Sequence, residues 1–307
     1  MSASRTSEPL PVAGVELGGT KCVCVLGSGP DDILAEARVA TTSPIETLDA
    51  VDEILRRWRD KYGFRALGIA SFGPLELAPR SPDHGRIVST PKPGWSGADL
   101  LGRARRWGAP VGLDTDVAAA AFAEGRWGAA RDLSAFAYVT VGTGIGVGSV
   151  QDGRSIRGLG HVEAGHLRVP RLSGAEAFAG ACPFHGDCVE GLASGPAIAA
   201  RAGFPAEQLT RSDPAWDEVV HALAALFHNL VLTTAPERIL VGGGIGMGQA
   251  HLLPRIRATL VDSLAGYAQG AQVAAQIDQF LVQPALGYRA GPMGALALGL
   301  MAAEKPI

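Results

Sequence analysis

The sequence predicts an α/β protein built from two related lobes. Short apolar runs bounded by glycine alternate with segments whose apolar residues recur at helical spacing, as expected of strands followed by helices. A strand, a glycine and threonine turn and a second strand occur first within residues 12–27 and again within residues 135–150. Because the same hairpin begins each half, we expect two lobes of similar design and place their boundary near Asp116.

The expected elements can be followed along the chain. VAGVEL and KCVCVLG form the first hairpin, and residues 43–63 carry the apolar stripe of an amphipathic helix. ALGIASFG is typical of a buried strand, residues 73–97 of a long loop, and APVGLDTD of a strand that leads into an alanine-rich helix. After the second hairpin we expect a long helix around residues 216–231, a strand, RILVGGGIG, that runs into a glycine loop, and a closing helix, AGPMGALALGLMAA.

Composition and charge exclude several classes of protein. The 307 residues include 27 Lys plus Arg against 30 Asp plus Glu, so a net charge of −3 offers no basic field for nucleic acid. No apolar run approaches the roughly 18 residues of a membrane span, and the first residues lack a basic segment followed by an apolar core. Four cysteines are too few for a disulfide scaffold in a chain of this length. We therefore expect a cytoplasmic protein that binds neither membranes nor nucleic acid.

Three glycine turns are candidates for binding phosphate. They are Gly18-Gly19-Thr20-Lys21, Gly142-Thr143-Gly144-Ile145-Gly146 and Gly242-Gly243-Gly244-Ile245-Gly246. Glycine lets the backbone approach a ligand closely, and the amide groups of such a turn can donate to phosphate oxygens. Neither the Walker spacing nor G-x-G-x-x-G occurs, which disfavours the P-loop and Rossmann classes. Each turn alone could be no more than a tight turn, but three together favour a nucleotide phosphate.

The acidic turn Asp114-Thr115-Asp116 stands where a predicted strand meets a predicted helix. A carboxylate at this place commonly caps the helix and is favoured by its dipole, which is one interpretation of Asp116. The alternative is a general base, since phosphoryl transfer needs one carboxylate that accepts the proton of the attacking hydroxyl. We favour the general base because Asp116 lies between the two lobes that carry phosphate turns.

Two thiols and an imidazole lie within seven residues in CPFHGDC, and a second imidazole precedes them. Cys182, His185, Cys188 and His166 supply four sulfur and nitrogen donors, which is a complete tetrahedral shell for zinc. A full shell leaves no position for water, so the ion would be structural. A Cys182–Cys188 disulfide and a pair of unrelated buried thiols are the alternatives. His161 is a spare imidazole that we expect at the surface or at a helix end.

Two acidic residues, Glu163 and Glu190, flank the predicted ligands. A metal that joins the two ligand segments would bring these carboxylates together, where they could hold sugar hydroxyls. Without the metal, both would be solvated surface charges. Cys22 and Cys24 alternate on one strand without histidine partners, so we expect them to be small core residues.

The motifs GVELGGTK, STPKPGW, GLDTDV, TVGTGIGVG, HVEAGHL and CPFHGDCVEGLASGPAI occur in this order. Together they resemble the ROK family of sugar kinases, and within it the zinc-containing bacterial fructokinases. The resemblance extends from about Ala13 to the final helix, and HVEAGHL together with CPFHGDC is its most specific part. Many ROK relatives have a C-x-C-G-x-x-G-C knuckle, whereas this chain has the C-P-x-H-G-D-C form of the fructokinase branch.

The resemblance implies a two-lobed actin-like (ribonuclease H-like) sugar kinase fold, with ATP and sugar in the cleft between the lobes. Residues 1–116 would form the N-terminal lobe, and residues 117–287 the C-terminal lobe with the zinc knuckle. A C-terminal helix over residues 288–307 would pack back on the first lobe. The residues that match family positions are Gly18, Gly19, Thr20, Lys21, Gly142, Thr143, Gly144, Gly243 and Gly244 for ATP, Thr115, Glu163, His166 and Glu190 for the sugar, His166, Cys182, His185 and Cys188 for a structural zinc, and Asp116 for catalysis.

The resemblance also implies an activity, the ATP-dependent phosphorylation of D-fructose to fructose 6-phosphate, with Mg²⁺ on the nucleotide and a homodimer as the assembly. Glucose, mannose or N-acetylmannosamine would be alternative substrates. A sugar-responsive repressor is a further alternative, disfavoured because only about a dozen residues precede Val12 and the chain is acidic. The chain departs from the family at Ala118, where Asn is frequent, and at Glu16, where Asp is commoner.

Overall fold

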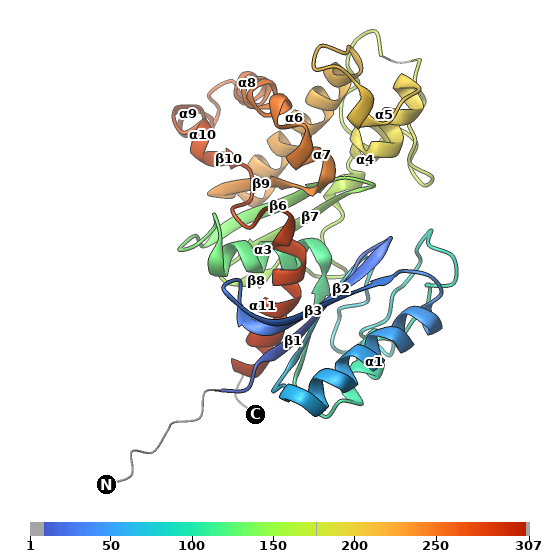
Figure 1. Cartoon of the computed structure of the whole chain (residues 1–307). Helices are drawn as coiled ribbons and strands as arrows, with labels where there is room; N and C mark the ends of the chain where they lie inside the picture. The colour runs from blue at the N-terminus through green and yellow to red at the C-terminus, as the bar shows by residue number, and fades with distance from the viewer. Residues whose placement is uncertain (1–8, 176, 305–307) are drawn as a thin grey trace. The chain divides into compact units, whose positions relative to one another are not determined.

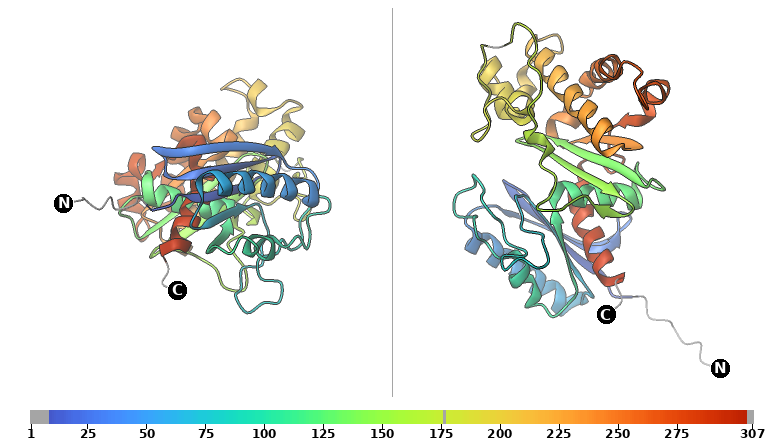
Figure 2. Two further views of the ribbon diagram at one scale, coloured as in Figure 1. Left: turned by 60° about the horizontal axis from the view of Figure 1, so that its bottom comes forward. Right: turned by 180° about the vertical axis from the view of Figure 1, so that it is seen from behind.

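The computed structural model describes residues 9–175 and 177–304, which form two compact units. Each unit holds one five-stranded mixed sheet with helices packed beside it (Figure 1, Figure 2). The first unit is made of residues 9–127, 158–161 and 289–304, and the second of residues 128–157, 162–175 and 177–288. The chain therefore returns to the first unit after completing the second.

The first sheet has the strand order β3-β2-β1-β4-β5. β1, β2 and β3 form antiparallel pairs, whereas β1, β4 and β5 run parallel to one another. The strands are β1 (Val12–Leu17), β2 (Lys21–Gly29), β3 (Asp32–Ala40), β4 (Leu67–Ser71) and β5 (Val111–Thr115). The helices of this unit are α1 (Pro44–Tyr62), α2 (Leu100–Arg105), α3 (Asp116–Trp127) and α11 (Ala290–Glu304).

Helix α1 has the start signal and the stripe that its sequence predicts. The hydroxyl of Ser43 accepts the amide hydrogen of Glu46 at 3.3 Å, and a proline occupies the first helical position. The helix packs against β2 and β3. Its buried apolar residues are Val51, Ile54, Leu55 and Trp58. Cys22 and Cys24 are fully buried in the same core, as predicted.

A row of three glycines lets α11 lie directly on the first sheet. Gly14, Gly68 and Gly112 occupy one register row across β1, β4 and β5. A methyl group on Gly68 would stand 1.9 Å from the carbonyl oxygen of Ala295, and one on Gly112 would stand 2.2 Å from that of Leu298. Helix backbone thus fills the space that side chains would otherwise take, and α11 packs against β1, β2, β4, β5 and α3 (Figure 1).

The second sheet, β10-β9-β6-β7-β8, repeats the topology of the first. β6 and β7 form an antiparallel hairpin as β1 and β2 do, and β9 runs parallel to β6 as β4 does to β1. The strands are β6 (Ala135–Val141), β7 (Ile145–Gln151), β8 (Arg154–Ser155), β9 (Arg238–Gly242) and β10 (Leu281–Val282). The prediction of two α/β lobes of similar design is confirmed.

Helices α4, α6, α7 and α8 pack around the second core, which the sheet completes. The α-helices of this unit are α4 (Val189–Ala193), α5 (Gly195–Ala202), α6 (Ala215–Thr234), α7 (Gly243–Gly248), α8 (Leu253–Leu264), α9 (Gly270–Ala275) and α10 (Ile277–Phe280). The 3-10 helices are η1 (Ala164–His166), η2 (Ala206–Gln208), η3 (Ala250–Leu252) and η4 (Gly287–Arg289). The predicted stripe of α6 is buried at Trp216, Val219, Val220, Leu223, Phe227, Leu230 and Val231.

Most predicted elements are confirmed, and a few differ. Sequence analysis missed β3, whose residues alternate between exposed and half-buried positions, and the short helices on either side of α6. The segment expected to be a glycine loop after β9 is helix α7. The first unit continues through α3 to Trp127, whereas the sequence analysis ends the lobe at Asp116. Residues 305–307 of the expected C-terminal helix lie outside the described residues.

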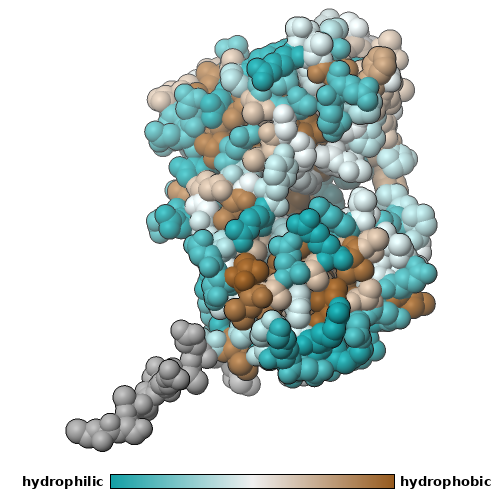
Figure 3. All heavy atoms as spheres, in the orientation of Figure 1, coloured by the Kyte–Doolittle hydropathy of each residue, from teal (hydrophilic) through white to brown (hydrophobic). Residues whose placement is uncertain are grey.

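The surface carries scattered apolar groups. On the face drawn in Figure 3, hydrophobic residues lie in small groups among hydrophilic ones. Exposed apolar side chains such as Ile45, Phe184 and Tyr267 come from separate segments, a common pattern that needs no special explanation. Across residues 9–175 and 177–304, no helix combines the length and the apolar character that a membrane crossing requires.

Substituting the central glycine of the row should destabilise the first unit. In Gly68→Ala the added methyl group would clash with α11 backbone, so we expect a loss of about 3 kcal/mol in the free energy of unfolding, measured by urea denaturation. Gly158→Ala is the matched control, because a methyl group there meets no atom within 4 Å. Equal stabilities of the two variants would contradict the close packing of α11.

Candidate functional site

The first glycine turn joins β1 to β2, and other segments hold its carbonyl groups. The hydroxyl of Thr41 donates to the carbonyl oxygen of Gly18 at 2.8 Å, and the amide of Thr41 donates to that of Thr20 at 2.9 Å. The ammonium group of Lys92, from the long loop after β4, donates to the carbonyl oxygen of Gly19. Thr41 and Lys92 thus hold the turn by its carbonyl oxygens, and these contacts do not involve the amide groups of the turn.

The acidic turn lies at the carboxyl end of β5, on the same edge of the sheet as the glycine turn after β1. In parallel sheets this edge is the usual place of ligand sites. Asp116 is the first residue of α3, and its Oδ1 accepts the amide hydrogen of Val117 at 2.9 Å. The hydroxyl of Thr115 accepts the amide hydrogen of Ala118 at 3.2 Å. Thr115 therefore caps the helix, a role that one interpretation gave to Asp116.

Glu16 is a second carboxyl group at this edge. The pKa of Glu16 is raised to about 7, chiefly by burial and secondly by the nearby charge of Asp116, whereas the charge of Lys21 lowers it. A methyl group on Gly291, in the first turn of α11, would stand 1.9 Å from Glu16 Oε1, so the carboxyl group is packed closely against this helix. Near neutral pH, the Glu16 carboxyl group is therefore partly protonated, and hence partly uncharged, at the sheet edge that also carries Asp116.

The four predicted metal ligands come together in the second unit. One donor atom from each of His166, Cys182, His185 and Cys188 lies within 4.8 Å of all the others. The Nδ1 atom of His166 stands 3.6 Å and 3.5 Å from the sulfurs of Cys182 and Cys188, and Nδ1 of His185 stands 3.7 Å from the sulfur of Cys182. A tetrahedron with zinc bonds of 2.0–2.3 Å has edges of about 3.3–3.8 Å, and these three separations fall in that range.

Backbone contacts hold the ligand segments in place. The amide of Cys182 donates to Gly186 O at 3.1 Å and the amide of Gly186 donates back to Cys182 O at 3.0 Å, with Gly186 in the left-handed region at φ +65°. The amide of Val189 donates to Leu167 O at 3.0 Å, which ties the His166 segment to the knuckle. Burial raises the pKa of the Cys188 thiol to about 11, so this thiol keeps its proton near neutral pH unless a cation replaces it.

Glu190 connects the ligand segments to the second glycine turn. It lies in the first turn of α4, and its Oε2 accepts the amide hydrogen of Ile145 at 2.9 Å. Helix η1 also packs closely against the same turn. A methyl group on Gly165 would stand 1.7 Å from Ile145 O, so there is no room for a side chain between them. Glu163, which directly precedes η1, is exposed. The cluster of cysteine and histidine side chains and the glycine turn are thus parts of one compact arrangement.

The third predicted turn lies beside the second. β6 and β9 are parallel neighbours, and the position of a methyl group on Gly142 would be 3.7 Å from the amide nitrogen of Gly244. Gly243 has φ +82°, and any side chain there would meet the carbonyl oxygen of Val141 at 2.5 Å. Only glycine suits this position, because the left-handed backbone and the close approach both exclude a Cβ atom.

The predicted residues fall into two groups, one in each unit. The first unit carries Gly18, Gly19, Thr20, Lys21, Thr115 and Asp116, and the second carries Gly142, Thr143, Gly144, Glu163, His166, Cys182, His185, Cys188, Glu190, Gly243 and Gly244. Sequence reasoning missed Lys92, although it stands in the quoted motif STPKPGW. His161, expected at the surface or at a helix end, is half-buried, and its Nε2 accepts the amide hydrogen of Leu75 in the long loop at 3.0 Å.

Comparisons with known proteins agree with this arrangement. The model of the ROK family matches residues 12–301. A fructokinase of Zymomonas mobilis is 41% identical over 299 residues, which cover 95% of this chain and 97% of the relative. A fructokinase of Pediococcus pentosaceus is 36% identical over 288 residues, covering 94% and 96%. The crystal structure of a ROK hexokinase from Thermus thermophilus superposes with a TM-score of 0.77 at 26% identity, covering 95% of this chain and 98% of that one.

Replacing Glu16 by glutamine should flatten the dependence of stability on pH. Because burial raises the pKa of Glu16 to about 7, the folded protein holds a proton there at pH values where the unfolded chain has lost it. The free energy of unfolding therefore falls as the pH rises through about 7, by at most ~1.4 kcal/mol per pH unit, and Glu16→Gln should remove this contribution. Urea denaturation between pH 5 and 8, without nucleotide or divalent cation, measures the slopes.

The matched control is Glu36→Gln, at an exposed carboxylate of β3. Parallel stability curves for the wild-type protein and Glu16→Gln would argue against a proton held by Glu16.

Proposed function

Because the chain belongs to the ROK family and has its two-lobed actin-like sugar kinase fold, we propose that it transfers the γ-phosphoryl group of ATP to the 6-hydroxyl of D-fructose. The products would be fructose 6-phosphate and ADP. The observation that carries this choice is the similarity to fructokinases over nearly the whole chain, together with the assembled Cys and His cluster beside Glu190.

Asp116 is the general base of the proposed reaction. Phosphoryl transfer requires the protein mainly to position the reactants and to neutralise charge, with one carboxylate to take the proton of the attacking hydroxyl. The geometry supports this role, because Asp116 directly follows β5 at the edge where ligand sites lie in parallel sheets, while Thr115 provides the cap of α3. Glu16 is partly neutral near pH 7, so it adds less repulsion against the negative charge of Asp116 and of a phosphate than a full carboxylate would.

The glycine turns would hold the phosphates of ATP. Backbone amides of residues 19–20, 143–144 and 243–244, with the ammonium group of Lys21, can donate to phosphate oxygens. The amides of Gly18 and Gly142 instead close their own turns by donating to Lys21 O and Gly144 O. Mg²⁺ bound with the nucleotide would neutralise part of the phosphate charge. Lys92, which holds the carbonyl of Gly19, supports the shape of the first turn.

Sugar hydroxyls would be held by Thr115, Glu163, His166 and Glu190. His166 presents Nδ1 to both cysteine sulfurs, which leaves its Nε2 as the nitrogen for a hydroxyl group. Glu190 Oε2 is occupied by the Ile145 amide, so its other oxygen is the better acceptor for the sugar. The hydroxyl of Thr115 already accepts from Ala118, but it can still donate its own hydrogen.

A structural zinc ion would be held by His166, Cys182, His185 and Cys188. The donor set and spacing support this ion, because two thiolates and two imidazoles are a usual closed shell for Zn²⁺. When bound, the ion would fix the orientation of His166 and the start of α4. We further propose a cytoplasmic homodimer, which light scattering after size-exclusion chromatography would test.

A second candidate is a kinase with a broader choice of hexose, including glucose, mannose or N-acetylmannosamine. It is favoured by the likeness to the Thermus thermophilus structure, which is described as a hexokinase. A DNA-binding repressor is less well supported, because the net charge of −3 gives no electrostatic attraction to a phosphate backbone.

ADP formation with a panel of sugars, ATP and Mg²⁺ tests the proposal. We expect the highest kcat/KM with fructose, and a higher value with glucose or mannose would contradict the choice of substrate. Asp116→Asn preserves shape but cannot accept the proton, so kcat should fall by about 10²–10⁴-fold. Asp60→Asn, on the exposed part of α1, is the matched control. Full turnover by Asp116→Asn would remove Asp116 from the role of base.

Removal of the metal should raise the KM for fructose more than the KM for ATP. Chelation releases the fixed orientation of His166 and Glu190, and restoring Zn²⁺ should reverse the change. The metal content, the melting temperature and both KM values are measured on the same samples. A protein that contains no zinc, or whose KM for fructose is unchanged after full removal, would contradict the structural metal.

A further inference from the structure

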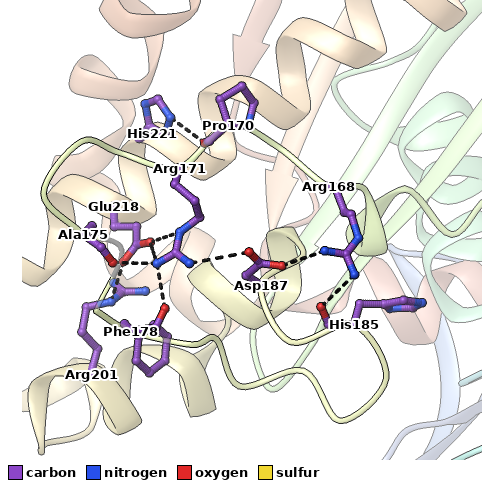
Figure 4. A network of polar contacts seen from close by, with 10 residues as sticks. All are labelled: Arg168, Pro170, Arg171, Ala175, Phe178, His185, Asp187, Arg201, Glu218 and His221. Atoms are coloured by element: carbon purple, nitrogen blue, oxygen red, sulfur yellow. Dashed lines mark hydrogen bonds and ion pairs between the residues drawn. The ribbon is translucent and has the colours of Figure 1, made fainter.

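We infer that Asp187, Arg171 and Glu218 are positioning residues that hold the metal-binding loop in place from helix α6, an inference that rests on the proposed metal centre. These residues come from three segments of the second unit and belong to a network of charges that also includes Arg168 and Arg201 (Figure 4). None of them offers a donor atom to the four-ligand cluster, yet two of the segments they join carry its ligands.

The network is anchored by a carboxylate inside the protein. Glu218 lies on α6, and only 3% of its side chain is exposed. Arg171 Nη2 stands 2.9 Å from Glu218 Oε1, and Arg201 Nε, from α5, stands 2.9 Å from Oε2. The contact with Arg201 is an ion pair without hydrogen-bond geometry. A buried carboxylate needs such compensation, so Glu218 keeps both arginines in place.

Arg171 extends the network from α6 to the loop. Its Nη2 donates to Ala175 O at 2.7 Å and to Phe178 O at 2.8 Å, and its Nη1 stands 3.6 Å from Asp187 Oδ2. Only 18% of the Arg171 side chain and 34% of the Asp187 side chain are exposed, so their ion pair lies partly out of solvent. Figure 4 shows Arg171 between Glu218 and Asp187.

Asp187 stands directly before the ligand Cys188 and is held by a second arginine as well. Arg168 Nη1 donates to Asp187 Oδ1 at 3.1 Å, and Arg168 Nη2 lies 3.5 Å from the carbonyl oxygen of His185. Both arginines belong to the segment that follows the ligand His166. The two ligand-bearing segments are therefore joined by side-chain contacts that do not depend on a metal ion.

This arrangement reduces the cost of assembling the site. Four donors must be brought within bonding distance of one ion, and any freedom of the loop must be lost when the ion binds. If the network has already restricted the loop, less freedom is lost and the affinity for the metal rises. Outer contacts of this kind typically change metal affinity by about 10–100-fold. A network that served only to stabilise α6 would leave the affinity of the folded protein unchanged.

The test compares metal binding by the wild-type protein and Asp187→Asn, using the full chain. Co²⁺ alone is the spectroscopic probe, because its visible absorption reports tetrahedral thiolate ligation, and competition with a chelator gives the affinity for Zn²⁺. We expect Asp187→Asn to bind Zn²⁺ about 10–100-fold more weakly, with an altered Co²⁺ spectrum. Asp217→Asn is the matched control, since Asp217 neighbours Glu218 on α6 but pairs with Arg255 at an exposed site. It should bind like the wild type.

Glu218→Gln provides a second measurement at the buried end of the network. It should lower the melting temperature and also weaken Zn²⁺ binding of the folded protein. Wild-type affinity and spectrum in Asp187→Asn would overturn the inference, as would a Glu218→Gln protein that is less stable but binds Zn²⁺ normally. A wild-type protein that takes up neither Zn²⁺ nor Co²⁺ would overturn the proposed metal centre itself, and this outcome is distinct from equal affinities among the variants.

Discussion

Three glycines in one row across β1, β4 and β5 determine how closely helix α11 approaches the first sheet. Because they have no side chains, the helix backbone occupies the space beside the strands, and α3 packs on the same helix. The carboxyl ends of these strands carry Glu16 and the turn that leads to Asp116. The close packing extends to Gly291, which lies against the Glu16 carboxyl group, so the protonation of that group is partly a result of how α11 is seated.

In the second unit, polar contacts rather than close backbone packing hold the site together, because they connect loop segments that have no regular structure of their own. The cysteine and histidine cluster, the Glu190 carboxylate and the turn at Ile145 follow one another in space. The ion-pair network extends this series to α6. A loop of this length without regular structure would normally be mobile, and these contacts give it a defined conformation.

Local patterns predicted the elements whose causes are local. The Ser43 cap and apolar stripe of α1, the hairpins and the three closely spaced donors of CPFHGDC are all visible in the sequence, and the structure contains them. The family resemblance supplied the general fold and the roles of the site residues. Sequence analysis missed β3 because the alternating residues on its inner face, Ile33, Ala35, Ala37 and Val39, are only half-buried and two of them are alanines, which favour strands weakly.

The contacts that the sequence could not predict join residues that lie far apart in the chain. Nothing near Gly68 indicates that Ala295 will stand over it, and nothing near Glu190 indicates that its carboxylate will meet the Ile145 amide. The contacts of Lys92 with Gly19 and of Arg171 with Glu218 are of the same kind. Such pairs follow from the assembled fold, and a lone charged residue in a sequence is by default a solvated one.

The packing of α11 on the glycine row also affects when each unit can fold during synthesis on the ribosome. The second unit is almost contiguous and has its residues available before α11 is made, whereas the first sheet lacks the helix that covers one of its faces until residues 290–304 have emerged. Nascent chains would therefore carry an uncovered apolar surface in their N-terminal part for most of translation, a period in which chaperones have a binding site that the finished protein no longer offers.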